Sequence, residues 1–516
     1  MARQTKASPP DFSRENRAIS ELLDRVAQIV DLTSVLALAN WDQNTAMSDG
    51  AVEMRGNHLA TLQGLLHELW TAERLCKVLE QLGDVQKEET LTDADKGLVR
   101  EARRGYERAT KLPHYLVQEL ARVRAASFDA WHKARSNNDF AFFAPWLQRT
   151  ISLQREVADH LGYEETRYDA LLDQFEPGMR SSRLDCLFTP VRQVSIHLLK
   201  GIEARKLAVD SSCLEGDFDV QKQIELSKAI LRNMGYQFTY GGIAVSPHPF
   251  TASFGSPFDV RLTVPPDPCS ILPAVMAAIH EGGHALYEQG IAPTLARTAL
   301  AGGVSMGMHE SQSRLWENSL GRSLSYWQGQ YPLLRATFPE HFARVDVEAF
   351  TCALNRVQPS LIRVEADEVS YNLHILIRYE MEQAMINGEV AVESLPGLWS
   401  AKYRDYLGIE PESDSHGILQ DGHWSAGFGY FPSYTLGNLY AAQIFQRLHR
   451  VFPDFDERLG NGETGCVLRW LQENMYSYGA TYMPEELIKR VTGEPLNPDY
   501  FVTYLSDKFT RTYQLS

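Results

Sequence analysis

Residues 270–290 read SILPAVMAAIHEGGHALYEQG, a stretch whose pattern favours a single helix. Ser270 belongs to the residue types that cap helices, and Pro273 fits a first helical turn. Gly290 is a common helix terminator. The Gly-Gly pair at 282–283 works against the helix, because each glycine costs about 1 kcal/mol relative to alanine. A close approach of this backbone to another helix or to a substrate would explain the pair.

The same stretch carries an H-E-x-x-H motif made by His280, Glu281 and His284. On a helix, the two histidines lie one turn apart on one face, where both imidazoles can bind a single ion. Glu281 is rotated by about 100° from His280, which places it beside the ion rather than on it. Two imidazole ligands and a carboxylate with one open coordination position favour Zn²⁺. The position of Glu281 beside the ion suits a general base that acts on a metal-bound water.

A catalytic zinc site needs a third protein ligand, and the sequence offers two candidates. The pattern breaks at Ala301-Gly302-Gly303, and a second helical stretch begins near His309. Glu310 and Glu317 both lie on this stretch, two turns apart. Spacing alone favours Glu310 and leaves Glu317 open.

Most of the remaining sequence has a helical pattern. Apolar residues recur at helical spacing in the first two hundred residues, as at Ile19, Leu22, Val26 and Ile29. The range 259–264 instead alternates with period two, which predicts a strand. We therefore expect a mostly α protein with a small β ribbon.

The domain organisation follows from the lack of linkers. No linker-like stretch separates independent domains, so we expect one large α-helical domain over residues 13–516. Residues 1–12 include Pro9-Pro10 and are expected to form a flexible N-terminal arm.

Composition excludes several classes of protein. The chain has 516 residues with 44% hydrophobic and 22% charged residues, typical of a globular fold. Its net charge of −16 disfavours a nucleic-acid partner. We find no secretory signal, and the apolar stretch 271–279 is about half a membrane span. Six dispersed cysteines without a C-x-x-C pair indicate free thiols. We expect a cytoplasmic protein with no membrane partner.

Further motifs occur in order between about residue 41 and residue 440. They are Trp41-Asp42-Gln43, His248-Pro249-Phe250, Asp259-Val260-Arg261-Leu262-Thr263, His280-Glu281-Gly282-Gly283-His284-Ala285-Leu286-Tyr287-Glu288, His309-Glu310-Ser311-Gln312, Ile362-Arg363-Val364-Glu365-Ala366-Asp367 and Gly417-Ile418-Leu419-Gln420-Asp421-Gly422-His423-Trp424. In kind and order this set resembles the carboxypeptidase Taq family of metallocarboxypeptidases.

The resemblance implies a large α-helical gluzincin whose two halves flank a deep active-site groove, usually as a homodimer. It implies an enzyme that removes single residues from free peptide C-termini with broad preference, except at proline-blocked ends. It also implies His280, His284 and Glu310 as ligands of one zinc ion per chain, which Co²⁺ can replace, and Glu281 as the catalytic carboxylate.

An enzyme of this kind must recognise a free α-carboxylate, which a guanidinium can bind through two hydrogen bonds. Arg363 is the favoured candidate, and the alternative for it is a salt bridge to a neighbouring helix. Arg261 is the second candidate; it could instead fix loops through Asp259 or lie on a solvated edge strand.

Two more substrate residues are expected in the Gly- and aromatic-rich loop at 416–437. His423 and Tyr434 are candidates for the donor that stabilises the tetrahedral oxyanion. Asp367 or Glu365 is a candidate for orienting a metal-bound imidazole.

Two other functions fit parts of the same pattern. A zinc endopeptidase or oligopeptidase would share the helix motif and the glutamate ligand. A non-catalytic metal-binding scaffold would share the ligands, but would have no use for Glu281 beside an open coordination position.

Overall fold

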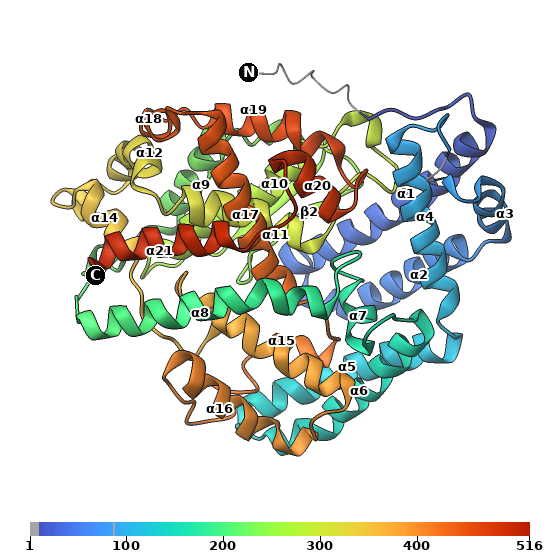
Figure 1. Cartoon of the computed structure of the whole chain (residues 1–516), viewed down its shortest axis with the longest axis horizontal. Helices are drawn as coiled ribbons and strands as arrows, with labels where there is room; N and C mark the ends of the chain where they lie inside the picture. The colour runs from blue at the N-terminus through green and yellow to red at the C-terminus, as the bar shows by residue number, and fades with distance from the viewer. Residues whose placement is uncertain (1–9, 86–87, 516) are drawn as a thin grey trace. The chain divides into compact units, whose positions relative to one another are not determined.

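The computed structural model describes residues 10–85 and 88–515 of the chain (Figure 1). The chain forms two compact units, each assembled from three segments that are separate in sequence. Unit 1 comprises Met1–Thr110, Ser211–Ala353 and Ile444–Pro495, and unit 2 comprises Lys111–Asp210, Leu354–Gln443 and Leu496–Ser516. The expected groove between two halves stays a prediction.

The expected N-terminal arm is described only in its last residues, because residues 1–9 lie outside the described range. The side chain of Phe12 is buried. The hydroxyl of Thr294 donates to the carbonyl of Pro10 at 2.6 Å, and the hydroxyl of Thr92 donates to that of Asp11 at 2.8 Å. Residues 10–12 are therefore attached to unit 1.

Unit 1 is mainly helical. Its helices, two of which end one residue beyond the unit, are α1 (Arg17–Thr45), α2 (Val52–Trp70), α3 (Glu73–Leu82), α4 (Asp93–Lys111), α9 (Val220–Met234), α10 (Leu272–Gln289), α11 (Met306–Arg314), α12 (Leu324–Thr337), α13 (Pro339–Phe342), α14 (Val347–Leu354), α18 (Phe455–Gly460), α19 (Gly465–Asn474) and α20 (Pro484–Thr492).

The first helix shows how sequence pattern and packing agree. The Asn16 side chain accepts hydrogen bonds from two backbone amides and so caps α1 at its N-terminus. Ile19, Leu22, Val26 and Ile29 are all buried, which confirms the predicted apolar stripe.

A small three-stranded sheet packs against α10. Its strands are β1 (Ile243–Val245), β2 (Thr251–Ser253) and β3 (Val260–Val264), in the order β1-β3-β2. The strand β3 pairs parallel with β1 and antiparallel with β2. It is the central strand rather than the edge strand that was the alternative for Arg261. Thr263 on this strand is fully buried.

Unit 2 is built from helices of the middle and end of the chain. They are α5 (His114–Asn137), α6 (Phe140–Leu161), α7 (Arg167–Leu172), α8 (Ser181–Arg205), α15 (Tyr371–Asn387), α16 (Leu395–Leu407) and α21 (Asp499–Tyr513), with α17 (Pro432–Val451) running on into unit 1.

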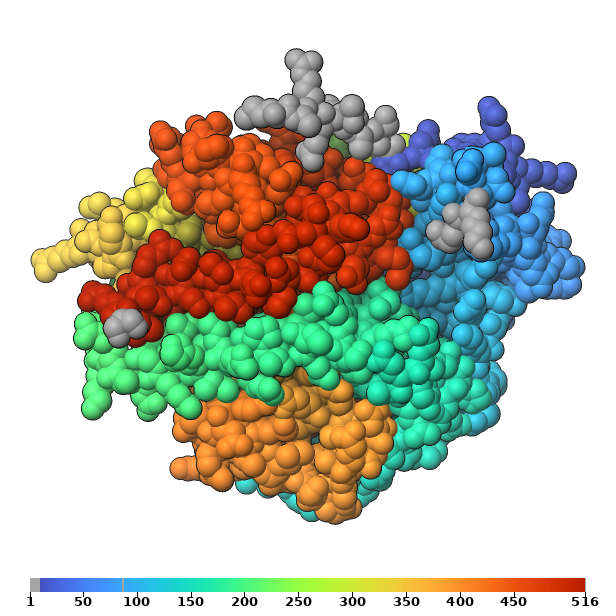
Figure 2. Space-filling model, viewed as in Figure 1, coloured from blue at the N-terminus to red at the C-terminus, as the bar shows by residue number. Residues whose placement is uncertain are grey.

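Within unit 2, the long helix α8 lies between α21 and α15 (Figure 1). Figure 2 shows the same arrangement in space-filling form, with α8 as a green band between the red and orange segments. Helix α15 is buried on nearly all sides. Charged side chains on such a helix need partners, because an isolated buried charge is costly.

No helix in the described part of the chain is long and apolar enough to cross a membrane. All six cysteines are thiols rather than halves of disulfides, as predicted.

Candidate active site

The predicted helix is α10, and two close contacts explain its Gly-Gly pair. A Cβ atom on Gly283 would lie 2.5 Å from the carbonyl oxygen of Gln312 in α11. A Cβ atom on Gly282 would lie 2.7 Å from a methyl group of Leu231 in α9. Glycine thus lets α10 approach α11 closely enough for their side chains to meet.

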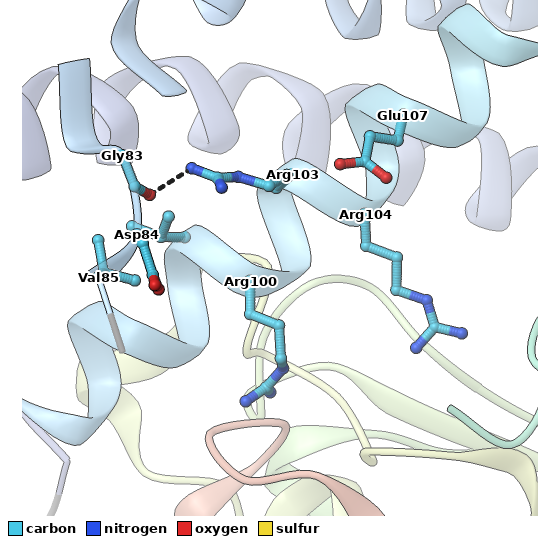
Figure 3. A pocket seen from close by; sticks show the side chains of 8 residues that line it. Gly83, Asp84, Val85, Arg100, Arg103, Arg104 and Glu107 are labelled. Atoms are coloured by element: carbon cyan, nitrogen blue, oxygen red, sulfur yellow. Dashed lines mark hydrogen bonds between the residues drawn. The ribbon is translucent and has the colours of Figure 1, made fainter. Parts of the chain in front are cut away.

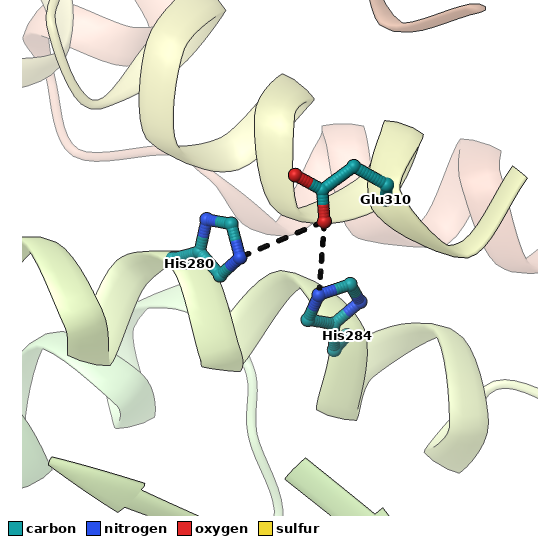
Figure 4. A group of neighbouring side chains, drawn as sticks. All are labelled: His280, His284 and Glu310. Atoms are coloured by element: carbon teal, nitrogen blue, oxygen red, sulfur yellow. Dashed lines mark ion pairs between the residues drawn. The ribbon is translucent and has the colours of Figure 1, made fainter. Parts of the chain in front are cut away.

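That approach brings together His280, His284 and Glu310 (Figure 4). Glu310 Oε2 lies 3.8 Å from His280 Nε2 and 3.5 Å from His284 Nε2. The three ligand atoms all lie within 4.8 Å of one another, so one ion can contact all of them. The structure therefore favours Glu310 over Glu317 as the third donor.

Glu310 is held as an anion by its neighbours. Arg314 Nε donates to Glu310 Oε1 at 2.7 Å, and the Ser313 hydroxyl donates to Glu310 Oε2 at 3.1 Å. Burial raises the pKa of the carboxyl, but Arg314, His280 and His284 outweigh it and hold this pKa well below its usual range.

Glu317 binds the other side of His280. The helix α11 continues as a short π-helix, η6 (Leu315–Leu320), which carries this glutamate. His280 Nδ1 lies 2.7 Å from Glu317 Oε2. Such a carboxylate holds the proton on Nδ1 and leaves Nε2 free to bind an ion. Glu317, the open alternative for the third ligand, thus orients a ligand instead.

His284 is oriented in the same way by His309. The Nδ1 atoms of the two rings lie 2.6 Å apart, and His309 Nε2 lies 2.9 Å from Glu288 Oε1. Both Nδ1 positions are therefore occupied, so the prediction that Asp367 or Glu365 orients an imidazole is wrong. Asp367 instead accepts hydrogen bonds from its own neighbours, such as the amide and hydroxyl of Ser370.

The electrostatics of the cluster suit a cation. Burial lowers the pKa of His280, but Glu310, Glu317 and Glu281 together raise it to about 9. Burial also lowers the pKa of His284, and here it dominates. The site thus combines a neutral imidazole at His284 with three carboxylates that create a negative field at His280.

The carboxylate of Glu281 lies beside this cluster and is held by the sheet. Thr251 Oγ1 in β2 donates to Glu281 Oε2 at 2.7 Å and lies 3.0 Å from its backbone carbonyl. Thr251 was not predicted as a site residue; its position directly after His248-Pro249-Phe250 is the signal that could have indicated it.

Two imidazoles and one carboxylate, each with a partner that fixes its orientation, form a donor set that suits a divalent metal with an open coordination position. Comparison with known proteins identifies the family of the chain. Residues 21–509 match the family described as carboxypeptidase Taq (M32) metallopeptidase.

The chain belongs to this family.

The chain is 38% identical to carboxypeptidase 1 of Bacillus subtilis, an alignment that covers 96% of this chain and 98% of the relative. It is 40% identical to thermostable carboxypeptidase 1 of Thermus thermophilus, with 96% and 99% covered. The crystal structure of an M32 carboxypeptidase from Deinococcus radiodurans superposes with a TM-score of 0.93 at 34% identity, with 97% and 100% covered. The protein is thus a metallocarboxypeptidase, and the predicted family and mostly helical fold are confirmed.

In this M32 chain, Arg363 lies in unit 2 within a buried cluster of charges. Its Nη2 donates to Asp421 Oδ1 at 2.9 Å, and its guanidinium lies 5.3 Å from the ring centre of Tyr434. Arg378 Nε donates to Asp421 Oδ2 at 2.6 Å. The salt bridge expected as the alternative for Arg363 therefore exists, but its partner lies in a loop rather than on a helix.

Asp421 is shared between two guanidinium groups. Burial raises the pKa of its carboxyl, but Arg378 and Arg363 hold this pKa far below its usual range. One carboxylate thus faces two cations, and the Arg363 guanidinium is only partly neutralised by it.

His423 and Tyr434 both lie beside Arg363 in unit 2. His423 Nδ1 lies 3.7 Å from Asp421 Oδ1, and its ring lies 4.5 Å from that of Phe431. Burial and the two arginines outweigh Asp421 and lower the pKa of His423 to about 4. A neutral imidazole at pH 7 keeps one N–H for donation.

Arg261, the second candidate for the carboxylate, is already engaged. Its Nε and Nη2 donate to the two carboxylate oxygens of Asp259 at 2.8 and 2.7 Å. This two-point pair fits the loop-fixing role that the sequence offered as the alternative.

A separate pocket of unit 1 is lined by arginines of α4, among them Arg100 and Arg103 (Figure 3). Arg103 Nη2 donates to the carbonyls of Leu79 and Gly83 at the end of α3. Arg100 donates to the carbonyls of Ala480 and Thr481. These arginines thus satisfy backbone carbonyls and connect segments of unit 1.

Proposed function

We propose that this chain is a zinc-dependent carboxypeptidase that releases single amino acids from peptides with a free C-terminus. We further propose a broad preference for the released residue, with proline-blocked ends resisting cleavage. The observation that carries the proposal is the cluster of His280, His284 and Glu310 with the Glu281 carboxylate beside it.

The donor set supports zinc as the metal. Two imidazole nitrogens and one carboxylate oxygen with an open position are typical of catalytic zinc sites, and cobalt accepts the same ligands. Glu317 and His309 orient the two imidazoles, and Arg314 keeps Glu310 ionised.

A divalent ion bound by these side chains would supply a Lewis acid that polarises the scissile carbonyl and makes water more acidic. Glu281 takes a proton from the attacking water and later gives it to the departing amine. Thr251 holds Oε2 of this carboxylate, which leaves Oε1 for the proton transfer.

Arg363 is proposed to bind the substrate α-carboxylate. Its charge is only partly balanced, because Asp421 also pairs with Arg378. A carboxylate is the natural partner for a buried guanidinium of this kind. Arg261 is proposed to support the surrounding loops through Asp259, and His423 or Tyr434 to donate to the oxyanion.

A matched pair of peptides tests the exopeptidase activity. The two peptides share one sequence and differ only in a free or amidated C-terminus. We expect release of the last amino acid from the free acid alone, measured by chromatography. Equal cleavage of both peptides, or internal cleavage, would identify an endopeptidase or oligopeptidase instead. No cleavage of either would leave only a metal-binding scaffold.

Metal removal tests the role of zinc. Dialysis against a chelator should abolish the release of amino acids, and one equivalent of Zn²⁺ or Co²⁺ per chain should restore it. Elemental analysis of the freshly purified protein shows which ion it carries, and full activity of a metal-free sample would refute the proposal.

The family resemblance also supports a homodimer, and the six thiols support a reducing compartment such as the cytoplasm. Sedimentation velocity at micromolar concentration would give about twice the 58.3 kDa mass of the chain if the dimer forms.

A further inference from the structure

Two buried charged residues of α15, Arg378 and Glu382, hold the segment that surrounds His423. They lie four residues apart, so both project from one side of the helix. Arg378 is fully buried, and Glu382 is 1% exposed. None of the motifs that suggested the family contains either residue.

Arg378 holds the beginning of the segment. Its Nε donates to Asp421 at 2.6 Å, and its Nη2 donates to Gln420 Oε1 at 2.8 Å. The same Gln420 oxygen accepts a hydrogen bond from the backbone amide of Arg363 at 3.0 Å. Residues 420–421 are thus attached both to α15 and to the proposed carboxylate-binding arginine.

Glu382 holds the end of the segment. Trp424 Nε1 donates to Glu382 Oε1 at 3.0 Å, and the backbone amide of Gly429 donates to Oε2 at 3.0 Å. A third donor, the Tyr168 hydroxyl of α7, lies 2.8 Å from Oε2. The last contact comes from outside the segment.

The backbone at Gly429 is fitted closely to α7. Its φ angle is +95°, and a Cβ atom there would lie 2.7 Å from the carbonyl carbon of Leu171. The amide that binds Glu382 is therefore in a conformation and a space that only glycine accepts. His423 lies between the two attachment points, next to Trp424.

We propose that Glu382 is a positioning residue for substrate binding: it anchors Trp424 and Gly429, and thereby sets where His423 lies relative to Arg363. The inference rests on the proposed function, in which Arg363 binds the α-carboxylate of the peptide and His423 or Tyr434 donates to the oxyanion. Glu382 itself touches no substrate.

The two oxygens of Glu382 matter because three donors point at them. A carboxylate has two acceptor oxygens, whereas a glutamine has one oxygen and an amide that donates. If the glutamine oxygen accepts from Tyr168 and Gly429, its amide faces the indole N–H of Trp424. The glutamine amide and the indole N–H are then two donors facing each other, so Trp424 loses its hydrogen bond to residue 382.

The experiment compares three single variants. Glu382→Gln and Trp424→Phe both remove the bond between these residues, whereas Tyr168→Phe removes a donor that lies outside the segment. Each variant is loaded with zinc, its metal content is checked, and kcat and KM are measured for a free-acid peptide. Stability is measured in parallel by urea unfolding.

Positioning predicts a specific pattern. Glu382→Gln and Trp424→Phe should each lower kcat/KM by roughly tenfold or more, because His423 is no longer held in place beside Arg363. The double variant should be no worse than either single variant, because both remove one contact. Tyr168→Phe should lower stability and leave kcat/KM within about twofold of the wild type.

Other outcomes overturn the inference. If Tyr168→Phe lowers kcat/KM as much as Glu382→Gln, Glu382 serves stability alone. If Glu382→Gln keeps the wild-type kcat/KM, or if the effects of the double variant add, the contact does not position the substrate site. Wild-type protein that releases no amino acid would instead refute the proposed function, and this inference with it.

Discussion

The Nδ1 atom of His284 lies 2.6 Å from the Nδ1 atom of His309. For Nε2 of His284 to bind an ion, its Nδ1 must carry the proton and donate it to His309. His309 then carries its own proton on Nε2 and donates to Glu288 at 2.9 Å. The tautomers of both rings are thereby fixed by one buried carboxylate.

This chain of contacts predicts that His309 controls metal affinity. His309→Phe should weaken zinc binding by about 10–100-fold, because His284 loses the acceptor that fixes its tautomer. Competition with a chromogenic chelator measures the dissociation constant. Glu288→Gln keeps an acceptor oxygen and should have a smaller effect, and the exposed His58→Phe should have none. Wild-type affinity in His309→Phe would contradict the role of His309.

Glu281→Gln should separate metal binding from catalysis. The variant should keep a full equivalent of zinc, but its kcat should fall at least about 10²-fold, because the amide cannot accept the water proton. Elemental analysis and the free-acid peptide assay give the two values. Glu310→Ala is the converse variant and should lose zinc itself. Full zinc occupancy in Glu310→Ala would mean that another residue supplies the third ligand.

Arg363→Ala should impair recognition of the C-terminus. We expect KM for the free-acid peptide to rise by at least about tenfold, because a charge-assisted contact to the α-carboxylate is worth about 1.5–3 kcal/mol. Asp421 would still pair with Arg378, so the fold should survive. Steady-state kinetics on the peptide provide the test, with Arg261→Ala as the comparison. An unchanged KM in Arg363→Ala would assign the carboxylate to another cation.

Gly283→Ala should destabilise unit 1. The new methyl group would meet the backbone of Gln312 and Ser313 in α11, which cannot rotate away. A cost of about 1–3 kcal/mol is typical of such overpacking, and the midpoint of urea unfolding reports it. Gly64→Ala in α2 has nothing within 4 Å of the new atom and should stabilise by up to about 1 kcal/mol. Equal midpoints for the two variants would rule out the close contact.

Glu382 should make stability depend on pH. Burial raises the pKa of its carboxyl from 4.5 to about 7, although hydrogen bonds from Gly429, Tyr168 and Trp424 oppose the shift. The folded state therefore holds this proton more tightly than the unfolded chain. The contribution of this protonation to the free energy of unfolding is complete below about pH 4.5. It is lost as the pH rises through 7, by about 3 kcal/mol in total.

Urea unfolding between pH 4.5 and 7.5 measures this effect. The difference in unfolding free energy between the wild type and Glu382→Gln should fall steadily as the pH rises. The exposed Glu365→Gln should follow the wild-type profile. Parallel profiles for the wild type and Glu382→Gln would show that Glu382 does not titrate in this range.

Much of the metal centre could be predicted from local sequence. The helix around His280 and the strand β3 follow from periodicity over a few residues, and the spacing of His280 and His284 fixes their shared face. The break after residue 300 placed Glu310 on a second helix near the first. Family resemblance then added the metal and the reaction.

The partners of the charged residues could not be predicted in this way. The sequence places acidic residues next to Arg363, yet its partner Asp421 lies 58 residues away. Arg378 and Glu382 have the spacing of an exposed helical ion pair, but both are buried and bind different parts of one loop.

The sequence by itself determined the helices, the central strand and the residue types that can bind and activate a metal, because these depend on contacts between near neighbours. Only the tertiary structure decided that Glu310 joins the cluster while Glu317 contacts His280, that His309 contacts His284, and that Thr251 holds Glu281. The physical reason is that a buried polar group must find a partner wherever packing brings one, however distant in sequence.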